Sequence, residues 1–98
     1  MPDDDWGLAP PPFNAEQSLL QLQRAMRDAR LAARGKGFEL RGKVVVELEV
    51  KDAAVAARLV RRPANTPEWD SFTVKSASDQ RKLIDEVKRR LARWTDED

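Results

Sequence analysis

Hydrophobic and polar residues alternate strictly between residues 38 and 51. The apolar positions are Phe38, Leu40, Val44, Val46, Leu48 and Val50, and the polar ones are Glu39, Arg41, Lys43, Glu47, Glu49 and Lys51. Alternation of this length is typical of a β-sheet with one buried and one wet face. The pattern fits one long strand bent at Gly42. It fits equally a hairpin that turns at Leu40–Gly42, because a three-residue loop ending in glycine would keep Phe38 and Val44 on the same face.

Two other stretches repeat their apolar residues at helical spacing. The first, 15–34, follows Asn14 as a potential N-cap and ends before Gly35. The second, 78–94, follows Ser76, which has Asp79 three residues later in the spacing of a capping box. The apolar positions are Ala15, Leu19, Leu22, Met26, Ala29 and Ala33 in the first stretch, and Leu83, Ile84, Val87, Leu91 and Trp94 in the second. Both stretches predict amphipathic helices.

Residues 52–62 predict a short helix, because Asp52 can cap it and its four alanines favour helix over strand. A strand is the alternative, since Val55, Ala57 and Leu59 also alternate. A loop bounded by two prolines and a short strand over 69–75 follow.

These elements together predict an α+β fold. We expect a small, mainly antiparallel sheet of two to four strands, covered on one face by the helices 15–34 and 78–94, with the short third helix at an edge. The predicted core consists of Phe38, Leu40, Val44, Val46, Leu48, Val50, Phe72, Val74, Leu83, Ile84, Val87 and Leu91.

A length of 98 residues is sufficient for one domain, which we place at 14–94. Residues 1–13 form an acidic tail with four prolines, and residues 95–98 form a second acidic tail. The start of the chain does not resemble a signal peptide, and no apolar run is long enough to span a bilayer. We therefore expect a cytoplasmic protein that does not insert into a membrane.

The residue types that the chain lacks limit its chemistry. Without histidine or cysteine, it has no catalytic dyad or triad built on these residues and no zinc site of the usual type. Asp85 and Glu86 are neighbours on a predicted helix, and bases four residues away suggest ion pairs on a solvent face. Glu47 and Glu49 share a wet strand face without any accompanying phosphate-binding loop. We predict no catalytic residue, no metal ligand and no cofactor, and hence no enzyme.

The net charge of +1 hides an asymmetry along the chain. Residues 1–20 carry −4 and the last four residues carry −3, whereas residues 21–94 carry 18 bases against 10 acids, a net +8. Acidic ends can simply keep a basic domain soluble, or they can lie on its basic surface and compete with an acidic partner.

The leading functional hypothesis is a non-catalytic interaction module that binds another protein, with self-association into a homodimer as a further option. The alternative is a protein that binds the phosphate backbone of a nucleic acid through two basic clusters. The tentative protein-binding segment contains Asp3, Asp4, Asp5, Trp6 and Leu8. The candidate nucleic-acid contacts are Arg58, Arg61, Arg62, Lys88, Arg89, Arg90 and Arg93.

Overall fold

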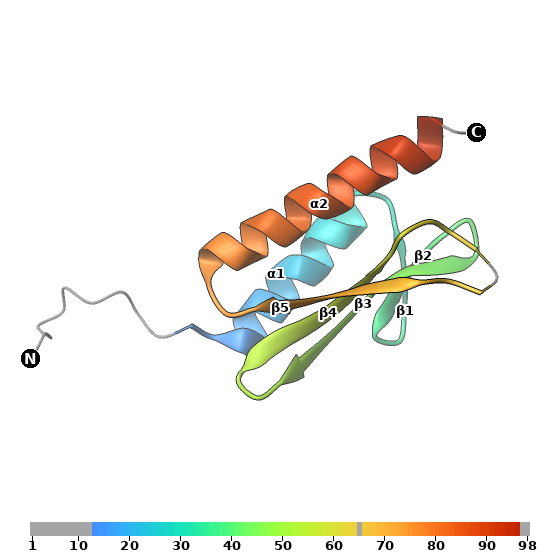
Figure 1. Ribbon diagram of the computed structural model, residues 1–98. Helices are drawn as coiled ribbons and strands as arrows, with labels where there is room; N and C mark the ends of the chain where they lie inside the picture. Colours follow the sequence, from blue (N-terminus) through green and yellow to red (C-terminus); the bar gives the residue numbers. More distant parts are fainter. Residues whose placement is uncertain (1–12, 65, 97–98) are drawn as a thin grey trace, which may run out of the picture.

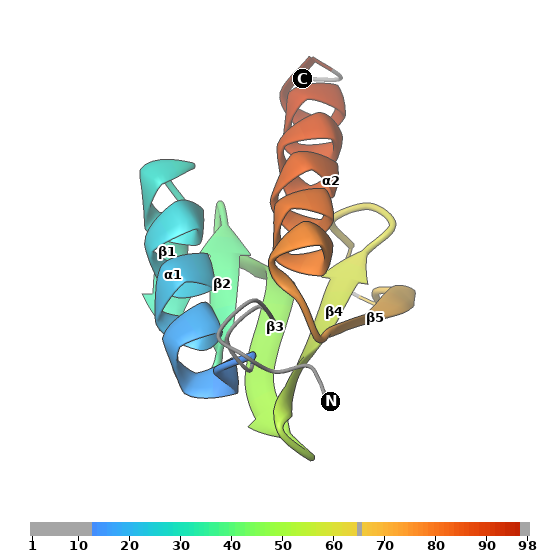
Figure 2. The same cartoon turned by 90° about the vertical axis from the view of Figure 1, so that its left-hand side faces the viewer.

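The structure, a computed structural model, describes residues 13–64 and 66–96. Five strands form one antiparallel sheet in chain order, and two helices lie side by side on one of its faces (Figure 1). In chain order the elements are α1 (Ala15–Asp28), β1 (Ala32–Arg34), β2 (Gly37–Leu40), β3 (Lys43–Lys51), β4 (Ala54–Val60), β5 (Trp69–Val74) and α2 (Ala77–Asp96). Figure 2 shows that the opposite sheet face carries neither helix. No helix in the described part of the chain has the length and apolar character needed to cross a membrane.

The expected number of strands is wrong: the α+β sheet has five strands, not two to four. One of these strands is β4, which replaces the predicted third helix and confirms the strand alternative for residues 52–62. Asp52 and Ala53 both adopt positive φ, at 54° and 60°, and form a tight turn that pairs Lys51 with Ala54. Pairing with a strand on either side outweighs the helix preference of the alanines, because β4 lies between β3 and β5.

The strand that the sequence did not predict is β1, which replaces the end of the predicted first helix. The helix stops at Asp28, Arg30 adopts a φ of 70°, and Leu31 is buried. The next three residues pair with β2 as an edge strand. Ala33 continued the helical spacing in the sequence, but the backbone does not follow it.

The alternating segment 38–50 is a hairpin whose loop has two residues, not three. Arg41 and Gly42 both have positive φ, at 55° and 83°, and the strands close with Leu40 opposite Lys43. A β-bulge compensates for the shorter loop: Phe38 pairs with Val46 and Glu39 with Val44, so that the residue between them is extra. Val45 and Val46 are therefore both fully buried, and the strict alternation predicted from the sequence is interrupted there.

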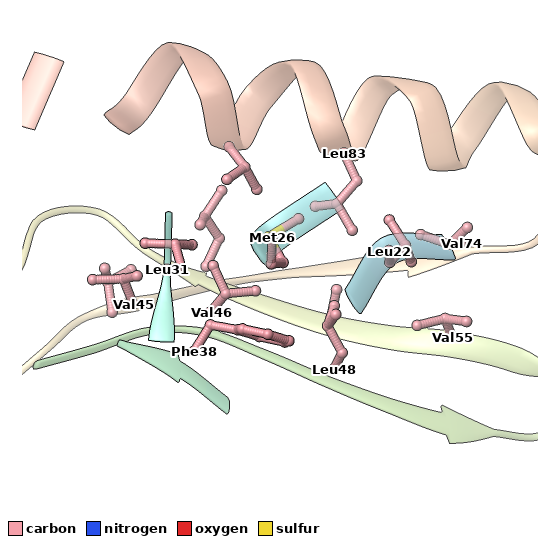
Figure 3. Close-up of a cluster of buried hydrophobic side chains, with 14 of the residues drawn as sticks. Leu22, Met26, Leu31, Phe38, Val45, Val46, Leu48, Val55, Val74 and Leu83 are labelled. Carbon is pink, nitrogen blue, oxygen red and sulfur yellow. The ribbon is translucent and has the colours of Figure 1, made fainter. Parts of the chain in front are cut away.

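The core lies between the sheet and the two helices (Figure 3). The assignment of Val50 to the core is wrong, because Val50 is 38% exposed near the tip of the β3–β4 hairpin. Val44, also assigned to the core, is only partly buried. Six predicted residues are buried, and four more pack against the core while partly buried. The buried six are Phe38, Val46, Leu48, Val74, Leu83 and Val87, and the partly buried four are Leu40, Phe72, Ile84 and Leu91. The predicted core omitted the other buried hydrophobic residues, which are Ala15, Leu22, Met26, Leu31, Val45, Ala54, Val55, Ala57, Leu59, Val60 and Trp94.

Both predicted helix caps are confirmed. The backbone N–H of Gln17 donates to Oδ1 of Asn14 over 3.0 Å, and that of Asp79 donates to Oγ of Ser76 over 3.1 Å. The two helices are joined near their N-termini, where the Ser18 hydroxyl donates to Oε1 of Gln80 over 2.7 Å. In this arrangement α1 packs on β3 and β4, while α2 packs on β5.

Candidate binding surface at the β5 edge

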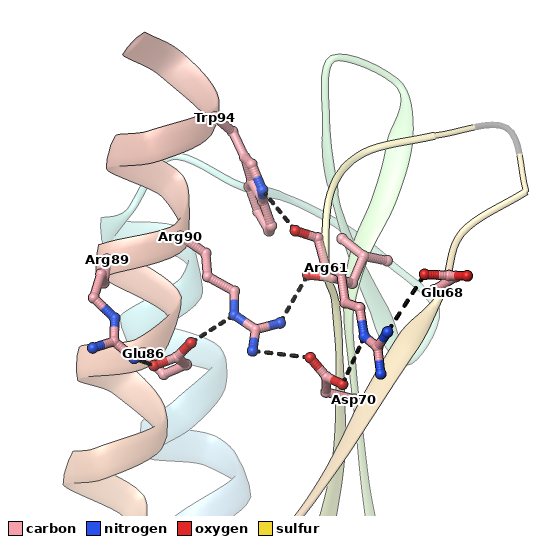
Figure 4. Close-up of polar contacts among 8 residues, drawn as sticks. Arg61, Glu68, Asp70, Glu86, Arg89, Arg90 and Trp94 are labelled. Atoms are coloured by element: carbon pink, nitrogen blue, oxygen red, sulfur yellow. Dashed lines mark hydrogen bonds and ion pairs between the residues drawn. The ribbon is translucent and has the colours of Figure 1, made fainter. Parts of the chain in front are cut away.

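A polar network fastens α2 to the end of the sheet (Figure 4). Arg90 reaches from α2 and places Nη2 at 3.0 Å from Oδ2 of Asp70 on β5. Its Nε donates to Oε2 of Glu86 over 2.6 Å, and its Nη1 donates to the Val60 carbonyl over 3.1 Å. The side chain of Arg90 is only 14% exposed, so this arginine is a part of the packing between helix and sheet.

The second half of the network lies on the segment between β4 and β5. Arg61 donates from Nε to Oδ1 of Asp70 over 3.0 Å and lies 3.5 Å from Glu68. The indole N–H of Trp94 donates to the Arg61 carbonyl over 3.3 Å. Asp70 is thus shared by two arginines from different elements.

The hydrogen bond from Arg61, helped by Arg90, holds the pKa of Asp70 below its usual range, and Asp70 in turn raises the pKa of Arg61. Because the folded pKa of Asp70 is depressed, its contribution to stability is present above the unfolded pKa of about 3.9 and is lost as the pH falls through the folded value. We expect Asp70→Asn to lose less stability than the wild type between about pH 5 and pH 2.

Urea unfolding across this pH range measures the difference. Asp28→Asn is the matched control, because Asp28 is an exposed aspartate that forms no ion pair with the described residues. Equal loss of stability in the wild type and Asp70→Asn would contradict the proposed role of the network.

The structure brings together some, but not all, of the arginines predicted as a basic surface. Arg61, Arg62 and Arg93 line a surface hollow of about 470 Å³ at the start of β5, together with Ala64, Thr66 and Glu68. Neither Arg62 nor Arg93 forms an ion pair with another described residue. Separate clusters from β4 and from the end of α2 therefore converge at one corner of the molecule.

The other predicted basic residues lie elsewhere or already have partners. Arg58 is on the uncovered sheet face, where it is paired with Glu47 and stacks on Trp69 at 4.6 Å from the ring centroid. Arg89 pairs with Glu86, and Lys88 is exposed on α2. The predicted residues therefore do not form one continuous basic face.

The uncovered sheet face is shallow and nearly balanced in charge. A hollow of about 310 Å³ runs across β3, β4 and β5, with small side chains such as Ala56, Ser71 and Thr73 among those that line it. Arg58 pairs with Glu47 across the strands, and Lys36 lies 3.3 Å from Glu49. These pairings leave little unmatched charge for an ionic ligand on this face. Within the described residues, no group of three acidic side chains is placed to hold a metal ion.

The edge of the sheet at β5 has a defined hydrogen-bonding pattern. The Arg61 N–H donates to the Glu68 carbonyl over 3.0 Å, which makes this pair a hydrogen-bonded one in an antiparallel ladder. Since the two kinds of pair alternate, Asp70, Phe72 and Val74 direct their backbone groups toward β4. The N–H and C=O groups of Trp69, Ser71 and Thr73 therefore point outward, away from β4.

This edge has little of the usual protection in the part of the chain that the structure describes, its one charged residue being Asp70, which faces α2 and is paired there. No hydrogen bond to the backbone of Trp69, Ser71 or Thr73 is present beyond the sheet, and the strand contains no proline, lysine or bulge. The opposite edge, β1, is only three residues long. Natural proteins usually block an open edge of this kind. The three outward-facing residues of β5 are left open, and we therefore regard this edge as a candidate binding surface.

Sequence reasoning missed this surface, although it predicted the strand. The alternation of Trp69, Ser71 and Thr73 with Asp70, Phe72 and Val74 was a readable signal, but the edge position depends on the order of all five strands. The tentative partner-binding residues Asp3, Asp4, Asp5, Trp6 and Leu8 lie outside the described residues.

No family model matches the chain, and no curated protein or solved structure shows significant similarity to it. Its function must therefore be argued from the chemistry of its own residues.

Proposed function

We propose that this domain is a non-catalytic interaction module that binds another protein by accepting an extended segment along β5. The observation that carries the proposal is the row of outward N–H and C=O groups on Trp69, Ser71 and Thr73. Addition of a strand to an open sheet edge is a recurrent mode of peptide recognition, in which the backbone supplies affinity and neighbouring side chains supply specificity.

The surroundings of the edge support this proposal. On one side of β5, the hollow of the uncovered sheet face can receive alternate side chains of an added strand, next to Ser71 and Thr73. On the other side, α2 runs above β5 and is held there by Arg90 and Asp70. A bound segment would therefore lie against a rigid edge that needs no rearrangement.

A photo-crosslinking experiment tests the proposal. A benzophenone amino acid at Ser71 is expected to capture a specific protein from extracts of the source cell, and the same group at Leu20, which is 65% exposed on α1, is expected not to. Thr73→Pro in the Ser71 probe removes one edge N–H and should abolish the capture. Capture that is equal from both positions, or that survives Thr73→Pro, would refute strand addition at β5.

Nucleic-acid binding is a second candidate, because the helix layer carries an excess of exposed bases. Among the described side chains of the two helices, the exposed bases are Arg24, Arg27, Arg81, Lys82, Lys88, Arg89 and Arg93, and the exposed acids are Glu16, Asp28 and Asp85. Fluorescence anisotropy with short DNA and RNA at about 50 and 200 mM salt separates the candidates, since phosphate contacts weaken steeply with salt. Absence of binding at the lower salt concentration would eliminate this candidate.

A further inference from the structure

A stripe of charged residues follows the flank of α2 that lies beside β5. Lys82, Glu86, Arg89 and Arg93 are spaced by four, three and four residues, so they lie along one side of the helix. Figure 4 shows Glu86 between Arg89 and Arg90 on α2, with Arg90 reaching across to Asp70 on β5. Any strand added to β5 would therefore extend beneath this stripe.

The net charge of the flank is positive. Glu86 is already bound by Arg89 and Arg90, and Asp70 by Arg61 and Arg90. Lys82 and Arg93 have no ion-pair partner in the described chain, and both are exposed. Glu86 and Asp70 are therefore neutralised, whereas Asp79 accepts the Lys75 backbone N–H and has no ion pair in the described chain. Lys82 and Arg93 remain available to a ligand.

Both ends of β5 add to this excess of positive charge. Lys75 follows the strand directly and has an exposed side chain without an ion pair among the described residues. At the other end, Arg62 and Arg93 border the hollow beside Glu68. An extended segment as long as β5 would thus meet bases without ion-pair partners at each end and along one flank, with Asp79 as an opposing charge at the Lys75 end.

The same charges disfavour a second copy of this chain as the occupant. An antiparallel β5–β5 pairing would bring two α2 flanks together across a two-fold axis, with Lys82, Arg89 and Arg93 of each copy facing the same set in the other. Repulsion between like charges would oppose this dimer.

Building on the proposed function, we infer that the segment received by β5 is an acidic peptide in extended conformation. Its backbone pairs with Trp69, Ser71 and Thr73. Its alternate side chains on the helix side are carboxylates that face Lys82 and Arg93, where they gain charge-assisted contacts at the rim. The side chains on the other side are small or apolar and lie over the hollow of the uncovered sheet face.

The test uses labelled synthetic peptides of about eight residues, enough to span a strand of this length. One alternates glutamate with threonine, and its counterpart alternates lysine with threonine. Binding is followed by anisotropy and by amide chemical shifts of the full-length protein. We expect the glutamate peptide to bind roughly tenfold more tightly than the lysine peptide, as a few exposed ion pairs of ordinary strength would produce. We also expect it to shift the amides of Trp69, Ser71 and Thr73.

Substitutions on α2 test the charge argument. Lys82→Glu combined with Arg93→Glu should remove or reverse the preference, whereas Arg24→Glu combined with Arg27→Glu on α1 should leave it unchanged, because both pairs are exposed and only the first lies beside β5.

The outcomes distinguish this inference from the proposed function. If both peptides shift the β5 amides with equal affinity, the acidic preference is wrong while strand addition stands. If neither peptide shifts these amides, strand addition itself is wrong. It is also wrong if binding does not weaken when the backbone N–H groups along one edge of the peptide are methylated. A concentration-dependent dimer joined through β5 would also overturn the inference. So would displacement of the glutamate peptide by DNA, if both double variants lost DNA binding equally.

Discussion

Replacing Val46 by aspartate is expected to abolish cooperative unfolding. Val46 is fully buried, pairs with Phe38 on one side and Leu59 on the other, and belongs to the core between sheet and helices. A carboxylate placed there without a partner would cost about 4 kcal/mol or more, which is most of the usual stability of a small domain. Thermal and urea unfolding followed by circular dichroism measure the effect.

A matched control lies on the same strand. Val50→Asp introduces the same side chain at a position that is 38% exposed near the tip of the β3–β4 hairpin. This variant should retain a sharp transition within about 1 kcal/mol of the wild type. A sharp transition near the wild-type midpoint for Val46→Asp would contradict the assignment of the core.

The second large effect is expected for Arg90→Met, which should lower the free energy of unfolding by about 2 kcal/mol. Methionine retains the apolar stem but removes the ion pair with Asp70 and the hydrogen bond to the Val60 carbonyl. It also removes the guanidinium 5.9 Å from the centroid of the Phe72 ring. Urea unfolding at neutral pH measures the loss.

Arg89→Met is the control for this substitution, one position along the same helix. The side chain of Arg89 is 70% exposed and forms an ion pair with Glu86, which keeps its contact with Arg90 when Arg89 is changed. The expected change is within about 0.5 kcal/mol. Equal effects of the two substitutions would show that the network does not fasten α2 to the sheet.

The sequence predicted the parts of the fold that depend on local pattern. Alternation over 38–50 indicated a sheet with one wet face, and apolar spacing with the caps Asn14 and Ser76 located the starts of both helices. The failures occurred at residues 29–34 and 52–62, where alanines favour a helix in isolation. There the outcome was decided by pairing with neighbouring strands, which a local pattern does not contain.

The candidate binding surface was predictable only in part. The clustering of Arg61 with Arg62 and of Arg90 with Arg93 was visible in the sequence, but their roles differ in the structure. Arg90 is tied to Asp70, Glu86 and Val60, whereas Arg62 and Arg93 border an open hollow. This difference follows from the packing of α2 on β5, and so does the position of β5 at the edge.

Amide hydrogen exchange in the free protein tests the central claim most directly. We expect the amides of Trp69, Ser71 and Thr73 to exchange rapidly, and those of Asp70, Phe72 and Val74, which are directed toward β4, to be protected roughly a hundredfold more. Equal protection of Ser71, Phe72 and Thr73 would show that the β5 edge is already covered and would contradict its role as a binding surface.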